Sequence, residues 1–285
     1  MADLQPFYRD VQSHYDVSDD FYRLFLDPSM TYSCAYFERD DLTLEQAQLA
    51  KIDLALGKLD LQPGMRLLDI GCGWGATMVR AAQRYGAQVL GLTLSRNQYE
   101  HVAAAIDRLG LTGAEVRLQG WEEFEGRVDR VVSIGAFEHF RRDRYSEFFD
   151  RCYRILPQDG RMLLHTIIGH TLNDLRRMNI PVTRDAALFH IFMKREIFPG
   201  GQLPQPAEVT RSAGRAGFGT ERMQALRPHY ARTLDLWAQA LAEHRAEAVR
   251  LTSTQVYERY IKYLTGCASY FRSGHLDVVQ FTLVK

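Results

Sequence analysis

The fold is decided by one stretch of sequence, Leu67-Leu68-Asp69-Ile70-Gly71-Cys72-Gly73-Trp74-Gly75. An apolar run typical of a buried strand leads into three glycines at alternate positions, and the pattern of residues 76–85 then predicts a helix. Glycines let the chain turn tightly and let a ligand approach the backbone. The Gly-x-Gly-x-x-Gly spacing of a dinucleotide site is absent. The stretch therefore predicts either a different ligand-binding turn or a tight turn that holds no ligand.

The segments around this turn alternate in type. Strands are expected at residues 65–70, 88–92, 115–118, 128–134 and 161–168. Helices are expected at residues 43–60, 76–85, 96–109 and 144–156. This alternation predicts an α/β fold with a parallel sheet and helices on both faces.

After Ile168 the alternation stops, and residues 170–204 read as irregular to helical. Helices are expected again at 206–217, 230–248 and 253–272, with short strands at 222–227 and 277–284. We expect one domain, residues 1–285, rather than two. Its parts are an N-terminal helical segment (1–62), a core (63–168), an insertion (169–220) and a C-terminal completion (221–285). The insertion would lie beyond the carboxyl end of a strand, where ligands bind in such folds.

Composition narrows the class of protein. The 285 residues include 35 basic and 35 acidic side chains, 46% are hydrophobic and 25% are charged. These values are typical of a globular protein, and the balanced charge argues against a nucleic-acid-binding surface. No apolar run approaches the roughly 20 residues that span a bilayer, and the first residues lack a secretory signal, so we expect a cytoplasmic protein. The four cysteines are widely spaced, so neither disulfides nor a metal site are expected.

The second predicted strand departs from the common pattern for this turn. It ends Gly91-Leu92-Thr93-Leu94-Ser95, without the acidic residue that usually binds ribose hydroxyls. Thr93 or Gln98 must then supply the polar contact.

Further motifs make the interpretation more specific. In chain order they are Tyr32-Ser33-Cys34-Ala35-Tyr36-Phe37, Gly71-Cys72-Gly73-Trp74-Gly75, Gly91-Leu92-Thr93-Leu94-Ser95 and Gly120-Trp121-Glu122. Ser133-Ile134-Gly135-Ala136-Phe137-Glu138-His139-Phe140, Phe198-Pro199-Gly200-Gly201 and Tyr263-Leu264-Thr265-Gly266-Cys267 follow. Over residues 11–281 this series resembles the cyclopropane-fatty-acyl-phospholipid synthase family. It is most similar to the mycolic acid cyclopropane synthases and related mycobacterial mycolic acid methyltransferases.

The resemblance implies a class I S-adenosylmethionine-dependent methyltransferase with a Rossmann-like sheet. The core would bind the cofactor, and the insertion would hold the acyl substrate. The family's substrate is a cis alkene in a long acyl chain, whose π bond attacks the sulfonium methyl group. A base, bound bicarbonate in this family, deprotonates the resulting carbocation and a cyclopropane closes. Related members instead form methyl-branched or hydroxylated chains, and a non-catalytic lipid- or acyl-carrier-binding protein is a third possibility.

The same resemblance implies the site residues. Bicarbonate would be held by Glu138, His165 and Tyr230 and by the backbones of Cys34 and Ile167. Without the family, Glu138 reads equally well as a charge at a helix N-terminus, and His165 reads as a core histidine. The family often marks the position of Cys267 as active, but alkene methylation needs no covalent intermediate, so a buried structural thiol is the preferred interpretation.

Cofactor contacts are likewise carried over from the family. They are Tyr32, Ser33, Asp69, Gly71, Gly73, Thr93, Leu94, Gln98, Trp121 and Glu122. The last two follow a strand end where this fold usually meets the adenine. Aromatic residues that could stabilise the cation, or simply fill the core, are Tyr15, Phe198 and Tyr263, together with Tyr32 and Tyr230.

The expected partner is a long-chain acyl group, carried by an acyl carrier protein or a phospholipid. Residues 188–193, with Leu172 and Leu175, could line an acyl channel or belong to the core. Two arginine clusters, residues 141–144 and 176–177, could meet an acidic carrier or lipid phosphates, including those of a membrane surface, or could be solvated.

Overall fold

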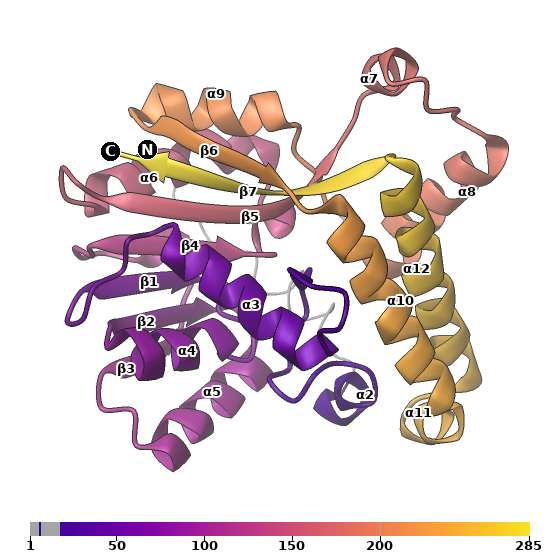
Figure 1. Cartoon of the computed structure of the whole chain (residues 1–285), viewed down its shortest axis with the longest axis horizontal. Coiled ribbons are helices and arrows are strands. Elements are labelled where there is room, and N and C mark those ends of the chain that lie inside the picture. The colour runs from indigo at the N-terminus through magenta and orange to yellow at the C-terminus, as the bar shows by residue number, and fades with distance from the viewer. Residues whose placement is uncertain (1–5, 7–17, 200) are drawn as a thin grey trace.

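A computed structural model describes residues 6, 18–199 and 201–285 (Figure 1). Seven strands form one sheet in the order β3-β2-β1-β4-β5-β7-β6. Their bounds are β1 Arg66–Ile70, β2 Gln88–Thr93, β3 Ala114–Leu118, β4 Arg130–Ile134, β5 Arg161–Gly169, β6 Gly219–Ala225 and β7 Leu276–Val284. The first five strands are parallel, as predicted. The sheet as a whole is mixed, because β7 lies between β5 and β6 and runs antiparallel to both.

The helices beside the glycine turn have the bounds that the sequence predicts. α4 (Ala76–Tyr85) lies between Gly75 and Gly86, both of which adopt the left-handed conformation. α5 (Arg96–Leu109) begins after Ser95, whose side chain accepts a hydrogen bond from the backbone of Gln98. Such caps satisfy backbone groups that the helix leaves free, so local sequence determines where these helices start and end.

Helices cover both faces of the sheet (Figure 1). α3 (Leu44–Gly57), α4 and α5 pack on the face that includes Leu67. α6 (Tyr145–Ile155) and α9 (Pro206–Ala216) pack on the opposite face, around Leu68. Neighbouring strand residues thus support opposite layers, because side chains alternate along a strand.

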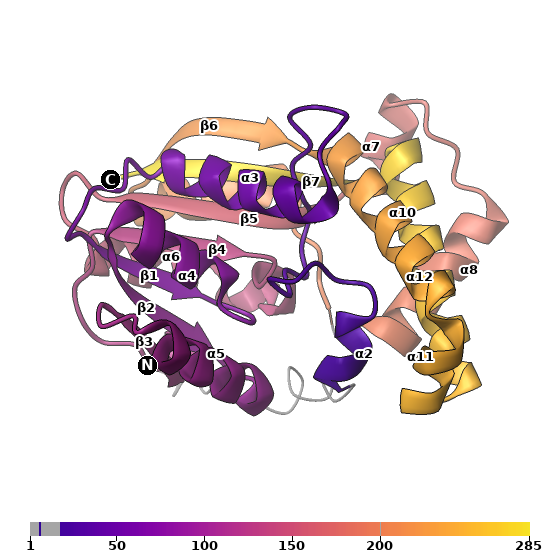
Figure 2. The ribbon, with the colours of Figure 1, turned by 60° about the horizontal axis from the view of Figure 1, so that its bottom comes forward.

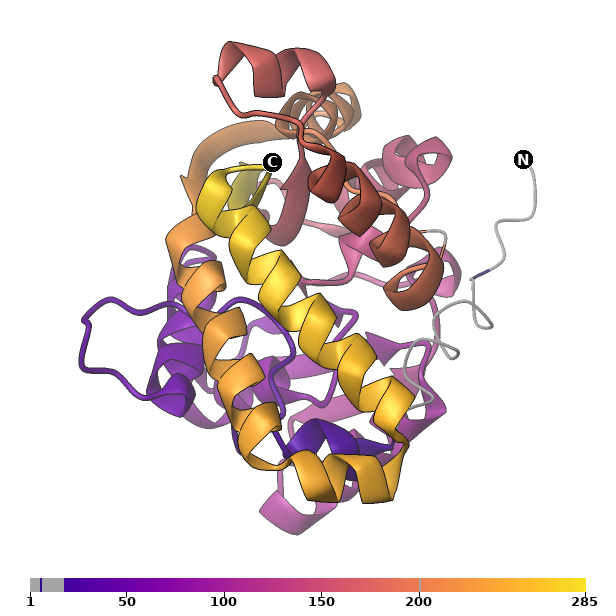
Figure 3. The same cartoon turned by 90° about the vertical axis from the view of Figure 1, so that its right-hand side faces the viewer.

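A second group of helices lies beside the sheet. α10 (Arg227–Glu243), α11 (Arg245–Leu251) and α12 (Thr254–Ser273) connect β6 to β7. α10 and α12 pack side by side (Figure 3), and the short helix α2 (Asp19–Arg23) contacts α11 (Figure 2). The single helix expected at 230–248 is therefore wrong. The chain leaves helical geometry at His244 (φ −99°, ψ 23°), where neither glycine nor proline signals the break.

The segment after β5 contains short helices. α7 (Leu172–Arg177) and α8 (Arg184–Phe192) project from the sheet (Figure 1), and one π-helical turn, Met193–Ile197, follows. The 3₁₀ turns Trp121–Glu123, Phe137–His139 and Arg142–Arg144 follow β3 and β4. Within the described part of the chain, no helix combines the length and apolar character needed to cross a membrane.

Candidate active site

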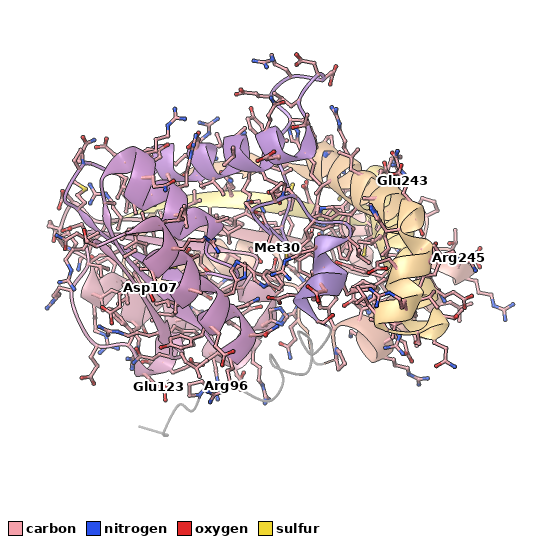
Figure 4. All side chains as sticks on the ribbon, turned by 90° about the horizontal axis from the view of Figure 1, so that it is seen from below. Met30, Arg96, Asp107, Glu123, Glu243 and Arg245 are labelled. Carbon is pink, nitrogen blue, oxygen red and sulfur yellow. The ribbon has the colours of Figure 1, made fainter. Side chains whose placement is uncertain are left out.

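A pocket opens at the carboxyl ends of β1, β2 and β4. All ten residues expected to contact the cofactor line it, from Tyr32 and Ser33 through the glycine turn to Glu122. Met30, labelled near α2 in Figure 4, also lines this pocket. The fold therefore brings together, from four separate parts of the chain, the residues that the family resemblance implies.

The glycine turn forms the floor of the pocket. Gly71 has φ +77°, and a Cβ atom there would lie 2.3 Å from Cβ of Ala136. The backbone amides of Gly71 and Cys72 both donate to the carbonyl of Leu92, at 2.9 and 3.0 Å. Only glycine satisfies both the left-handed conformation and this close approach.

Two carboxylates of the pocket have an oxygen that lacks a partner among the described residues. Oδ2 of Asp69 and Oε2 of Glu122 are buried and accept no hydrogen bond from the described residues. The other oxygen of Glu122, Oε1, accepts from Arg144 at 3.0 Å. Burial raises the pKa of Asp69 to about 7 and also raises the pKa of Glu122. Unpartnered buried acceptors are costly, so this pocket is suited to a ligand that carries N–H groups.

The end of β2 uses a hydroxyl and an amide in place of the usual acidic residue. The hydroxyl of Thr93 donates to Oε1 of Gln98 at 2.8 Å, and the backbone N–H of Ser95 donates to the same hydroxyl at 3.1 Å. Both side chains are buried and line the pocket. The two candidates for the missing ribose contact thus form one hydrogen-bonded unit.

Trp121 serves the core as well as the pocket wall. Its ring packs edge-on against Phe148 at 5.3 Å and lies 5.8 Å from Phe140. The residue belongs to the apolar cluster beneath α6. This side chain therefore contributes both to the core and to the pocket wall.

Lys51 of α3 is a pocket residue that was not predicted from the sequence. This lysine is 1% exposed, lines the pocket, and donates from Nζ to Oγ of Ser33 at 2.8 Å. Burial lowers its pKa to about 8, although the nearby carboxylate of Asp69 acts in the opposite direction. The helical spacing contained the signal, because Lys51 lies midway between Ala47 and Ala55 on the buried side of the helix.

Glu138 lies in the turn that follows β4. Its Oε1 accepts a hydrogen bond from the backbone N–H of Ile167 at 2.6 Å, while Oε2 is buried and unpartnered among the described residues. Burial raises the pKa of this carboxyl to about 7. Glu138 therefore keeps its proton to a higher pH than an ordinary glutamate does. The structure brings together Glu138 and Ile167, both of which were expected to hold bicarbonate. In this structure the Ile167 amide donates to the Glu138 carboxylate instead.

His165 is a buried side chain on β5. Burial, with the charges of Lys51 and Lys58, holds its pKa well below the usual value, so the ring is neutral. Nδ1 of the ring lies 3.3 Å from Nε2 of Gln280. Cys34 is buried in the apolar cluster that also contains Tyr230, and its thiol donates to the carbonyl of Ala35 at 3.1 Å.

An aromatic cluster adjoins the pocket through Tyr32. The Tyr32 hydroxyl donates to that of Tyr263 at 3.2 Å, and the Tyr32 ring lies 5.3 Å from Trp237. Tyr263 packs edge-on against Phe198 at 5.7 Å. Tyr230 also reaches Trp237, with ring centroids 6.2 Å apart. Burial raises the pKa of Tyr32 and of Tyr263, so both phenols stay neutral. Tyr15 lies outside the described residues.

Cys267 is a buried thiol on α12. Its Sγ lies 3.9 Å from Sδ of Met193, and burial raises its pKa. A raised pKa removes the thiolate, which is the nucleophilic form of cysteine. This environment favours the structural role.

The first arginine cluster already has acidic partners. Arg141 lies 3.5 Å from Asp143, Arg142 lies 3.6 Å from Glu208, and Arg144 binds Glu122 in the pocket wall. In the second cluster, Arg177 lies 3.8 Å from Asp174.

The apolar segment between α7 and the π-helical turn has two environments. Phe189, Phe192 and Met193 pack against the cluster of α10 and α12, whereas Leu188 and Ile191 are exposed. The segment is therefore partly core and partly surface.

Comparisons with known proteins identify the family. The family model described as mycolic acid cyclopropane synthetase matches residues 2–281. Cyclopropane mycolic acid synthase MmaA2 of Mycobacterium tuberculosis is 59% identical over 284 residues, which are 99% of each chain. Cyclopropane mycolic acid synthase 1 of the same species is 56% identical over 284 residues, again 99% of each chain.

Solved structures agree with these sequence matches. The structure of MmaA2 from Mycobacterium tuberculosis has a TM-score of 0.98 and covers 99% of this chain and 100% of its own. The structure of the synthase CmaA1 complexed with SAH and CTAB has a TM-score of 0.96 at 56% identity, over 99% of each chain. Because these matches span nearly the whole chain, the protein belongs to the mycolic acid cyclopropane synthetase family of S-adenosylmethionine-dependent methyltransferases.

Proposed function

We propose that this enzyme transfers a methyl group from S-adenosylmethionine to a cis double bond of a long-chain, mycolic-acid-type or fatty acyl substrate and closes a cyclopropane. The observation that carries the proposal is the position of Tyr32. This residue lines the pocket of the glycine turn and also hydrogen-bonds to Tyr263 in the aromatic cluster. A cofactor site and a cation-stabilising site therefore share one wall.

The pocket residues fit the cofactor. Asp69 and Glu122 each offer a buried oxygen that no residue in the described part of the chain hydrogen-bonds, and S-adenosylmethionine carries an amino group and an adenine amine that could donate to them. Gly71 leaves room at the turn, and Thr93 with Gln98 offers polar contacts for the ribose. When bound, the cofactor supplies an electrophilic methyl group.

The aromatic cluster suits the carbocation that forms on the substrate. Water would quench this cation, and the half-buried ring of Tyr32, with the buried rings of Tyr263 and Trp237, excludes water from one side of the site. Aromatic faces also attract cations, more strongly where solvent is excluded. Neutral phenols suit this role better than phenolates, which would react with the electrophile.

The proton-accepting base is, in this proposal, a bicarbonate ion beside Glu138. Two adjacent anions would repel each other, but a carboxyl whose pKa is about 7 can hold the proton that removes this repulsion. Its buried Oε2, which has no partner within residues 18–199 and 201–285, is then available to the ion. Tyr230, His165 and the backbone of Cys34 complete the proposed cradle. The backbone N–H of Ile167 would then donate a hydrogen bond either to both Glu138 and the ion or to the ion alone.

The substrate would reach the site beside α7 and α8, where apolar side chains are exposed. Leu172, Val182, Leu188 and Ile191 are each between 47% and 59% exposed. Such a surface fits peripheral contact with a lipid layer, or with the acyl chain of a carrier. Replacing Leu188 and Ile191 by serine should reduce cosedimentation with phosphatidylglycerol vesicles, and unchanged cosedimentation would exclude lipid contact here. A cytoplasmic location stays a prediction.

The test of the reaction uses cofactor with a trideuterated methyl group and an unsaturated acyl substrate. Cyclopropane formation removes one methyl hydrogen, so the product should gain one carbon, lose the alkene and retain two deuterium atoms. A methyl-branched or hydroxylated product with three deuterium atoms would support the related outcomes instead. Cofactor binding without turnover on any unsaturated acyl substrate, or no binding at all, would contradict the proposal and favour a lipid-binding protein.

A further inference from the structure

A row of polar side chains crosses the sheet next to His165. Gln280 of β7 pairs in register with His165 of β5 on one side and with Gln224 of β6 on the other. Residues paired directly across neighbouring strands lie on the same face of a sheet, about 5 Å apart. Lys58, the residue after α3, contacts the row from the helix layer. Gln280 is 0% exposed and His165 is 1% exposed, so the inner part of the row is protected from water.

The lysine sets the orientation of the glutamine amides. Nζ of Lys58 donates to Oε1 of Gln224 at 2.7 Å and to Oε1 of Gln280 at 2.5 Å. An ammonium group has donors only, so it requires the oxygen of the Gln280 amide to face it. The amide NH₂ group must then face the other way, where Nδ1 of His165 lies 3.3 Å away.

The amide in turn determines which ring nitrogen carries the proton. A neutral imidazole has one N–H and one acceptor nitrogen, and the nitrogen that faces an N–H donor must be the acceptor. We propose that Lys58 and Gln280 hold His165 as the Nε2–H tautomer, which makes Gln280 a positioning residue for the anion site. Burial and the charges of Lys51 and Lys58, which lower the pKa of His165, keep the second proton off the ring.

This tautomer assigns a limited role to His165, and the assignment rests on the proposed function. Nε2–H can donate a hydrogen bond to the proposed bicarbonate but cannot accept a proton. The ring therefore orients the base and does not replace it. Because the partner that fixes the ring lies on β7, the residue responsible is more than 100 positions from His165 in the chain and no local motif reveals it.

The first experiment needs no mutation. Nitrogen-15 NMR of histidine-labelled enzyme at pH 7 distinguishes protonated from unprotonated ring nitrogens, and the difference from a His165→Asn spectrum assigns the signals. We expect a protonated Nε2 and an unprotonated Nδ1 for His165. A protonated Nδ1 would overturn the inference whatever the enzyme's activity.

A matched pair of variants tests the role of the amide. In Gln280→Glu the side chain can only accept, so the proton of His165 should move to Nδ1, and cyclopropane formation should fall about ten- to a hundredfold for a lost hydrogen bond to an ion. Gln224→Glu places the same change on the other neighbour of Lys58 and should alter neither the tautomer nor turnover. An unchanged tautomer in Gln280→Glu would contradict the inference. If that variant does not fold, the spectrum of the unmodified enzyme decides alone.

The two proposals can fail separately. A tautomer shift in Gln280→Glu with full turnover would confirm the row and refute the role of His165 as a donor to the base. If both glutamate variants lost turnover while the tautomer of His165 stayed unchanged, the row of polar side chains would not be what determines the tautomer.

Discussion

Replacing Glu138 by glutamine should make the enzyme slower and, above neutral pH, more stable. The glutamine oxygen can still accept from the Ile167 amide, which bonds to Oε1 of Glu138 at 2.6 Å. The variant cannot ionise, however. General acid–base groups contribute about 10²- to 10⁴-fold to rates, so turnover should fall by that order. Cofactor affinity should be unchanged, because Glu138 is not among the residues that line the cofactor pocket.

The stability change follows from the pKa of the carboxyl. Its rise from 4.5 to about 7 on folding corresponds to roughly 3 kcal/mol. Between these pH values the folded protein keeps a proton that the unfolded chain releases. The free energy of unfolding therefore falls as pH rises through this window, and the loss is complete above pH 7. Glu138→Gln removes this loss.

The assay is urea unfolding of both proteins without cofactor or bicarbonate, at several pH values between 4 and 8. Near pH 4 the two free energies of unfolding should agree within about 1 kcal/mol. Between pH 4 and pH 8 the free energy of unfolding of the variant should rise relative to that of the unmodified protein by roughly 3 kcal/mol. Glu258→Gln changes an exposed glutamate of α12 and should differ from the unmodified protein by less than about 0.5 kcal/mol throughout.

A pH-independent difference for Glu138→Gln would show that the carboxyl is not destabilised by burial. The argument for a shared proton with bicarbonate would then lose its basis. Near-normal turnover in a folded variant would refute the catalytic role by itself.

Three further substitutions test the cofactor pocket and the thiol. Lys51→Met removes the buried charge beside Asp69 and should weaken S-adenosylhomocysteine binding about tenfold by calorimetry; equal affinity would show that the lysine only supports the fold. Gly71→Ala forces a Cβ atom within 2.3 Å of Ala136 and should lower the free energy of unfolding by more than about 2 kcal/mol, as chemical unfolding would measure. Cys267→Ala should keep turnover within about threefold, whereas loss of activity in a folded protein would restore a chemical role for the thiol.

Local signals explain how much of the fold was predictable. Gly75, Gly86, Ser95 and Gly110 cap two helices, and the bounds of both helices agree with the sequence prediction. The break at His244 was not predictable in the same way, because it has no local signal. It follows from the need to reverse the chain between α10 and α12, which is a tertiary requirement.

The site residues also separate into those that a sequence motif predicts and those that only the tertiary structure reveals. The pocket residues were predicted because the family resemblance implies them, and most of them follow strand ends that the parallel sheet brings together. Lys51 and Gln280 were missed because each is a polar residue in an apolar pattern, on a helix and on a strand respectively. Their positions make sense only once Ser33 and His165, their partners from distant segments, are known.

The choice of lysine at these two positions has a physical reason. Only five of the 35 basic residues are lysines, yet two of them, Lys51 and Lys58, lie near His165. A guanidinium needs up to five acceptors, as at Arg130, which is buried and bonds to the carbonyls of Leu59 and Asp129. An ammonium needs three at most and fits single oxygens, such as the hydroxyl of Ser33. Lysines can therefore place positive charge beside a neutral histidine without a ring of acceptors that would compete with the proposed anion for hydrogen-bond donors.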